Sequence, residues 1–191
     1  MLIPFGVFSA AGAGNGGTGG NFDLISTTIL GSSTASITFD TSTLGSTYKH
    51  LQIRSVTRYS SSTNPMLMRF NADSTYTNYR THWLWGNGSA VSSDTRQAAG
   101  YTGMSVNQDA IGSDFTASVF GPSVIDILDP FSSSKNKTVR SLVGTPGTYN
   151  NVRLQSGLWL NTAAVTSITL LDFGGSNFIA GSRFSIYGIK G

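Results

Sequence analysis

Short segments in which apolar and polar residues alternate recur along most of this chain. In residues 35–39, Ile37 and Phe39 fall on one face of an extended backbone, and Ser36 and Thr38 fall on the other. A period of two is typical of a half-buried β-strand. The same reading along the chain predicts strands at residues 22–30, 35–39, 48–58, 66–71, 76–85, 101–106, 115–120, 123–128, 137–143, 152–160, 165–172 and 182–189.

Clusters of turn-forming residues separate these segments, among them Asn87-Gly88, Thr145-Pro146-Gly147 and Gly174-Gly175-Ser176. Many short strands at regular spacing indicate a β-sandwich or a barrel. Of these we expect an all-β, jelly-roll-like β-sandwich. The polar stretch 86–114, which includes the candidate strand 101–106, has the weakest pattern and is also compatible with an excursion loop over the sandwich.

The composition agrees with an all-β chain. Glutamate is absent and 23 residues are glycine, so strong helix formers are scarce. Charged residues make up 11% of the chain, against about 25% in a typical soluble domain. Because proteins with few charges tend to associate, we expect this one to work within an assembly.

The N-terminus differs from the rest. An apolar start is followed at residues 12–20 by a glycine-rich linker, which predicts an extended arm at 1–21 and a sandwich domain at 22–191. The start lacks the basic residues of a secretory signal, and no stretch approaches the roughly 20 apolar residues of a membrane span.

Motifs for chemistry are weak. The tract Gly12–Gly17 matches G-x-G-x-x-G but is not followed by a helix pattern, so no dinucleotide site is expected. His50 and His82 lack metal-ligand spacing, cysteine is absent, and no G-x-S-x-G motif singles out a serine. We therefore expect no catalytic residue, cofactor or metal. The basic residues are dispersed rather than clustered, so nucleic acid is not an expected partner.

One aromatic segment has two open interpretations. In a regular strand at 76–85, Tyr79, Trp83 and Trp85 share a face, whereas Tyr76 and His82 point the other way. Such a cluster serves either as core or subunit interface, or as a contact for a glycan or receptor.

Four segments carry a family resemblance: MLIPFG at 1–6 running into a Gly/Ala tract, YKHLQIR at 48–54, DILDPF at 126–131, and the ending GSRFSIYGIKG at 181–191. With these segments the chain resembles a group of tailed-bacteriophage virion proteins, common among phages of aquatic bacteria. The resemblance covers nearly the full length and implies a structural protein of the particle, on the head or in the tail. It carries over no active-site residues.

The resemblance leads to a non-enzymatic capsid decoration or cement protein as the first expectation. We expect a homo-oligomer, a trimer by the habit of this class, made in the host cytoplasm and located in the virion. An apolar arm on a flexible linker can dock into a neighbouring subunit, and the resemblance implies that the partner is the major capsid protein or a tail protein. The residues expected to anchor the arm are Leu2, Ile3, Phe5, Val7 and Phe8.

Two alternatives stay open. The chain is also compatible with a tail or fibre module that binds host-surface glycan through the aromatic segment 76–88. The other alternative is a hydrolase whose site carries no recognisable motif.

Overall fold

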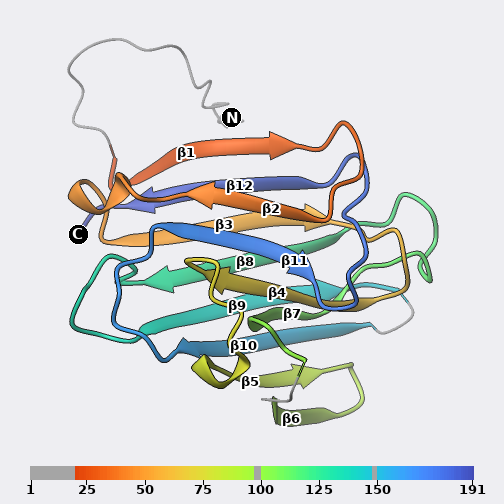
Figure 1. Ribbon diagram of the computed structural model, residues 1–191. Coiled ribbons are helices and arrows are strands. Elements are labelled where there is room, and N and C mark those ends of the chain that lie inside the picture. Colours follow the sequence, from red (N-terminus) through yellow and green to blue (C-terminus); the bar gives the residue numbers. More distant parts are fainter. Residues whose placement is uncertain (1–19, 97–99, 148–149) are drawn as a thin grey trace, which may run out of the picture.

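The computed structural model describes residues 20–96, 100–147 and 150–191, which form two antiparallel β-sheets packed face to face (Figure 1). From edge to edge, the large sheet consists of β1 (Phe22–Ile29), β12 (Arg183–Ile189), β3 (His50–Thr57), β8 (Gly121–Leu128), β9 (Lys137–Thr145), β10 (Asn151–Trp159), β5 (Tyr79–Gly86) and β6 (Val91–Arg96). The small sheet consists of β2 (Ser36–Asp40), β11 (Ser167–Asp172), β4 (Asn64–Phe70) and β7 (Met104–Ala110). Two short 3-10 helices, η1 (Leu44–Ser46) and η2 (Tyr76–Asn78), interrupt the loops. The prediction of an all-β chain is confirmed.

The core lies between the two sheets. The Trp159 ring of β10 packs against the Phe70 ring of β4, with centroids 5.4 Å apart. The Phe178 ring contacts both Tyr59 and Phe184, with centroids 4.9 Å apart in each pair. Buried aromatic side chains each remove about 150–250 Å² from water, so these rings supply a large share of the stabilisation between the sheets.

The predicted strand at 115–120 is wrong. The guanidinium of Arg58 donates hydrogen bonds of 3.0 Å to the backbone carbonyl oxygens of Phe115, Thr116 and Val119. Buried backbone carbonyls need a hydrogen-bond partner, and here the arginine supplies it in place of a neighbouring strand. The segment is therefore a loop shaped around a buried arginine.

The alternative of an excursion loop at 86–114 is also wrong, because this stretch contains β6 and β7. Two polar residues of β7 are buried with partners: Ser105 donates to the Gln108 amide oxygen at 3.1 Å, and Asn107 donates to the Ser123 hydroxyl at 3.2 Å. Internal hydrogen bonds remove most of the cost of burying polar groups, so a polar sequence here forms a largely buried strand at the edge of the small sheet.

All twelve described strands, from β1 to β12, belong to these two sheets. The predicted anchoring residues Leu2, Ile3, Phe5, Val7 and Phe8 lie outside the described residues. Among the residues that the structure describes, no helix is long and apolar enough to cross a membrane.

Candidate functional site

One face of the large sheet packs on the small sheet, and no described strand or helix covers the opposite face, here called the outer face (Figure 1). Successive residues of a strand point to opposite faces. Along β10, buried and exposed positions alternate, with Val152 and Leu154 exposed and Arg153 and Gln155 buried. The strand register therefore shows which residues project from the outer face.

Two rows of apolar residues cross the outer face. In one row, Val124, Leu142, Leu154 and Leu84 lie directly opposite one another on β8, β9, β10 and β5. The three leucines are 53%, 52% and 47% exposed at positions 142, 154 and 84. The neighbouring row holds Val56, Pro122, Gly144, Val152, Gly86 and Val91. We call the apolar side chains of both rows, Val56, Leu84, Val91, Pro122, Val124, Leu142, Val152 and Leu154, the outer apolar patch.

A contiguous exposed apolar surface is informative, because monomeric soluble proteins rarely expose large patches of this kind. Scattered single leucines at a surface need no explanation, but here the leucines face one another across neighbouring strands. Apolar faces of β-sheets commonly pack against a second apolar surface.

A polar row borders the outer apolar patch. The Asp126 carboxylate accepts a hydrogen bond of 2.7 Å from the Gln52 amide and one of 2.9 Å from Arg140 Nε. Arg140 lies opposite Ser156, and Ser156 lies opposite His82. The carboxylate is thus already neutralised by an arginine at the edge of the patch.

The outer face is basic. Four of its side chains are arginines, Arg54, Arg80, Arg140 and Arg183, whereas Asp126 is the acidic residue that the register places on this face of the described strands. Arg54 lies over the rings of Phe22 and Tyr187, at 5.3 and 5.1 Å from their centroids. A partner that fits this face would be apolar at its centre and acidic at its rim.

The aromatic segment does not form one surface. Tyr79 and Trp83 point into the sandwich and are 2% and 3% exposed, so neither ring is accessible to a surface ligand. Trp85 is half-buried on the same side, with Arg153 Cζ 5.2 Å from its ring centroid. Tyr76 lies in η2 and is 41% exposed, and His82 lies on the outer face. The five residues are therefore divided between the inside, the outer face and a loop.

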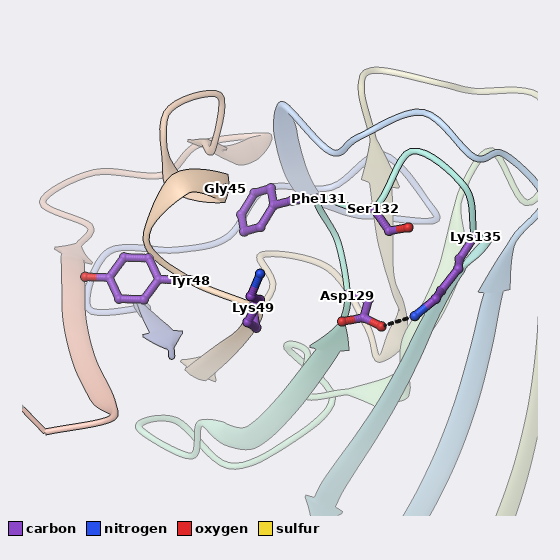
Figure 2. A pocket seen from close by; sticks show the side chains of 7 residues that line it. All are labelled: Gly45, Tyr48, Lys49, Asp129, Phe131, Ser132 and Lys135. Carbon is purple, nitrogen blue, oxygen red and sulfur yellow. Dashed lines mark hydrogen bonds and ion pairs between the residues drawn. The ribbon is translucent and has the colours of Figure 1, made fainter. Parts of the chain in front are cut away.

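A second candidate site is a hollow of about 210 Å³ at one end of the sandwich (Figure 2). Two loops form it, one leading from η1 into β3 and the other joining β8 to β9. We call it the end hollow, and its lining residues are Gly45, Tyr48, Lys49, Asp129, Phe131, Ser132 and Lys135.

An ion pair lies at the wall of the end hollow. Lys135 Nζ donates to the Asp129 carboxylate at 2.8 Å, and His50 Nδ1 accepts from the Asp129 backbone N–H at 3.0 Å. The hydrogen bond from Lys135 lowers the pKa of Asp129, and the charges of Lys135, His50 and Lys49 act in the same direction. Asp129 is therefore a carboxylate at neutral pH, and the amines of Lys135 and Lys49 are the positive groups that act on it.

A buried lysine holds one loop of the end hollow in place. Lys137 is fully buried, and its amine donates to the carbonyl oxygens of Ser132, Lys135 and Thr162 at 2.7, 2.6 and 3.0 Å. Burial lowers the pKa of Lys137, and the charge of Asp129 opposes that effect. Three carbonyl acceptors around one amine fix the loop that carries Ser132 and Lys135.

His50 and His82 do not meet. They lie on β3 and β5, with β8, β9 and β10 between them, and strand spacing alone separates them by roughly 19 Å. Within the described ranges, no group of three or more potential ligands is close enough to hold a metal ion.

The sequence interpretation did not single out the outer apolar patch or the end hollow. For the patch, a signal was available. β10 carries apolar residues at 152 and 154 and polar residues at 153 and 155. β8 and β9 carry apolar residues on both faces, so Val124 and Leu142 lie on the face opposite to the buried apolar residues of the same strands. For the end hollow there was no local signal, because residues about 80 positions apart form it. The sequence matches no model of a known protein family, and comparison with curated proteins found no significant relative.

Proposed function

We propose that this protein is a non-enzymatic structural protein of a tailed-bacteriophage virion, a capsid decoration or cement protein that docks on the particle. The outer apolar patch is the observation that carries the proposal, because it is a ready-made protein-binding surface on a chain with few charges. The expected partner is the major capsid protein, through a surface that is apolar and acidic.

The strand order supports a jelly-roll interpretation of the sandwich. Without the hairpins β5–β6 and β9–β10, the sheets have the orders β1-β12-β3-β8 and β2-β11-β4-β7. Most successive strands then alternate between the sheets, as they do in the jelly rolls of viral capsid and lectin domains. The two hairpins widen the sheet that carries the outer apolar patch. A shared fold alone does not fix a function, so the patch remains the main support.

The free energies of side-chain burial and of association favour docking through several side chains together. Complete burial of a leucine or valine side chain stabilises by about 1.5–3 kcal/mol, and side chains already half-buried contribute about half of that. Association costs several kcal/mol in lost freedom. A row of leucines therefore gives a modest affinity at one binding site. Attachment at many equivalent sites around a symmetric shell increases the overall avidity.

The proposal has two further parts. The N-terminal arm, residues 1–21, contributes a second attachment through Leu2, Ile3, Phe5, Val7 and Phe8. The resemblance to virion proteins adds a trimer as the assembled form. The arginines of the outer face would repel one another in a face-to-face pair of copies, so the trimer contact is expected at another surface.

The experiment adds purified protein to particles that lack it, and cryo-EM shows where density returns. Four versions are compared: the full chain, a version without residues 1–11, the double variant Leu142→Asp/Leu154→Asp, and the control Thr38→Asp. Thr38 is exposed on the other sheet, so its replacement introduces a charge away from the patch.

We expect density on the shell for the full chain and for Thr38→Asp, and loss of density for the double variant. Loss of density without residues 1–11, with the fold intact, supports the arm as an anchor. Unchanged occupancy of the double variant overturns docking through the outer apolar patch. Density on the tail instead of the shell replaces the decoration protein by a tail component.

A further inference from the structure

The end hollow combines the groups that recognise a sugar. Phe131 supplies an aromatic ring, Ser132 supplies a hydroxyl, and Asp129 and Lys135 supply an acceptor and a donor (Figure 2). The Tyr48 ring points away from these groups, and its hydroxyl donates to the Asp23 carboxylate at 3.3 Å. Ligand sites are characteristically apolar walls with a few convergent polar groups. Its volume of about 210 Å³ is below the 300–1,000 Å³ range of sites for drug-sized molecules, so it suits one sugar ring.

The charged residues that line the end hollow indicate which class of sugar it would bind. Lys135 is paired with Asp129 at 2.8 Å. The Lys49 amine has no hydrogen bond or ion pair with any described residue, and Figure 2 shows its side chain pointing toward the Phe131 ring. The charges of Lys135 and Lys49 both act on the single Asp129 carboxylate, so the lining of the end hollow carries one more positive than negative charge. The Lys49 amine is a donor for an anionic group.

We propose that the end hollow binds a sugar that carries a carboxylate, such as a uronic acid residue of a glycan. Lys49 binds the carboxylate, the Asp129–Lys135 pair and Ser132 bind ring hydroxyls, and the Phe131 ring contacts the C–H face of the sugar. This site lies at the end of the sandwich and does not depend on docking through the outer apolar patch.

The walls of the end hollow are held before any ligand arrives. The Lys137 amine donates hydrogen bonds to the carbonyl oxygens of Ser132 and Lys135, and His50 Nδ1 accepts a hydrogen bond from the Asp129 backbone N–H. On the other side, Phe131 packs closely on Gly45, where an added Cβ would lie 3.0 Å from the Phe131 ring carbon Cγ. Pre-organised groups bind more tightly because less freedom is lost on binding.

The test is an NMR titration of the isotopically labelled full chain with glucuronate, glucose and acetate. Glucose carries a neutral hydroxymethyl group in place of the carboxylate of glucuronate, and acetate lacks the sugar ring. We expect glucuronate to bind with a millimolar dissociation constant and to shift the amide signals of residues 45–49 and 129–135. Glucose and acetate are expected to bind at least about tenfold more weakly, since hydrogen bonds to charged groups contribute strongly.

Two variants locate the site. Lys49→Gln is expected to weaken glucuronate binding by about tenfold or more, whereas Arg183→Gln removes one charge on the outer face and should leave the affinity unchanged. A dispersed spectrum identical to wild type away from the substitution shows that each variant is folded.

Several outcomes overturn the proposal. Equal binding of glucose removes the role of the carboxylate, and equal binding of acetate reduces the site to an anion site without sugar recognition. Unchanged affinity in Lys49→Gln, or shifts outside the two loops, places any binding elsewhere. The particle-docking proposal is unaffected by each of these results, because its own test uses the outer apolar patch.

Discussion

Leu142 of β9 and Leu154 of β10 lie directly opposite each other and both project from the uncovered outer face of the large sheet. Facing side chains on neighbouring antiparallel strands have Cβ atoms about 4.5–5.5 Å apart, so the two leucines form one continuous apolar surface. Val124 and Leu84 extend it on either side. The relationship explains why the patch is a surface feature and not a set of isolated exposed residues.

The first prediction concerns this pair in solution. In Leu142→Ser/Leu154→Ser, binding of a hydrophobic dye should fall, while Tm changes by no more than about 4 °C, because surface substitutions usually alter stability by less than about 0.5 kcal/mol each. Dye fluorescence and calorimetry measure the two effects. A fall in Tm of many degrees would show that these leucines belong to the core.

The second prediction concerns the buried Lys137. Lys137→Met leaves the carbonyl oxygens of Ser132, Lys135 and Thr162 without their donor. We expect a loss of about 3 kcal/mol in the free energy of unfolding, which lowers Tm by roughly 6–12 °C. Denaturant unfolding gives the value. The matched control is Lys135→Met, where the side chain is 65% exposed and the expected change is within about 0.5–1 kcal/mol.

The third prediction concerns Gln155, which is 2% exposed on the inner side of β10. Neither of its side-chain amide atoms has a hydrogen-bond partner among the residues that the structure describes. An unsatisfied buried polar group costs about 1–3 kcal/mol, and an apolar group of similar shape avoids that cost. Gln155→Met should therefore raise the free energy of unfolding by about 1 kcal/mol. The same change at Gln52, whose amide donates to Asp126 at 2.7 Å, should lower it. A destabilised Gln155→Met would contradict the interpretation.

The fourth prediction is a pH dependence centred on Asp73. Its carboxylate accepts from Trp159 Nε1 and from the Asn78 amide, each at 2.8 Å, and from the Thr75 backbone N–H at 2.9 Å. Burial acts to raise the pKa of Asp73, but the hydrogen bonds from Asn78, Trp159 and Thr75 together lower it below the ordinary value of 3.8. The unfolded chain therefore binds this proton more readily than the folded chain does.

A lowered carboxyl pKa stabilises the fold fully above the ordinary value, and this stabilisation is lost as the pH falls through the lowered pKa. We expect Asp73→Asn to destabilise by about 1–2 kcal/mol at neutral pH. The difference from wild type should shrink below about pH 4. Urea unfolding followed by tryptophan fluorescence at several pH values measures it. A difference that stays constant from pH 7 to about pH 3 would show that the Asp73 charge contributes nothing.

The sequence predicts most strands well where alternation is local and regular. β2, β8, β11 and β12 lie close to the predicted segments because each satisfies the period of two over several residues. It fails at 115–120, because the alternation there is genuine but Arg58, far away in the chain, takes the carbonyls that a strand would need. The strand β7 was obscured for the opposite reason, since its polar residues find partners only in the folded protein.

In the aromatic segment too, the local pattern predicts one feature and long-range contacts decide another. The pattern correctly placed Tyr79, Trp83 and Trp85 on one face and His82 on the other. It could not decide which face is covered, because that depends on where the second sheet packs. Burial of Tyr79 and Trp83 follows from β5 being added to the large sheet beside β10, with β7 against its inner side.

By itself the sequence determined that this protein is an all-β chain of short strands, because period-two alternation, frequent turn residues and a scarcity of helix formers act locally along the backbone. The tertiary structure alone decided which side of each strand became the inside. On β10 it placed Arg153 and Gln155 inward and Val152 and Leu154 outward, and Arg153 Nε donates to the Asp109 carboxylate of β7 at 2.9 Å. An ion pair between strands distant in the chain offsets the burial of the arginine. The leucines are thereby left at the surface, where the protein is proposed to meet its partner.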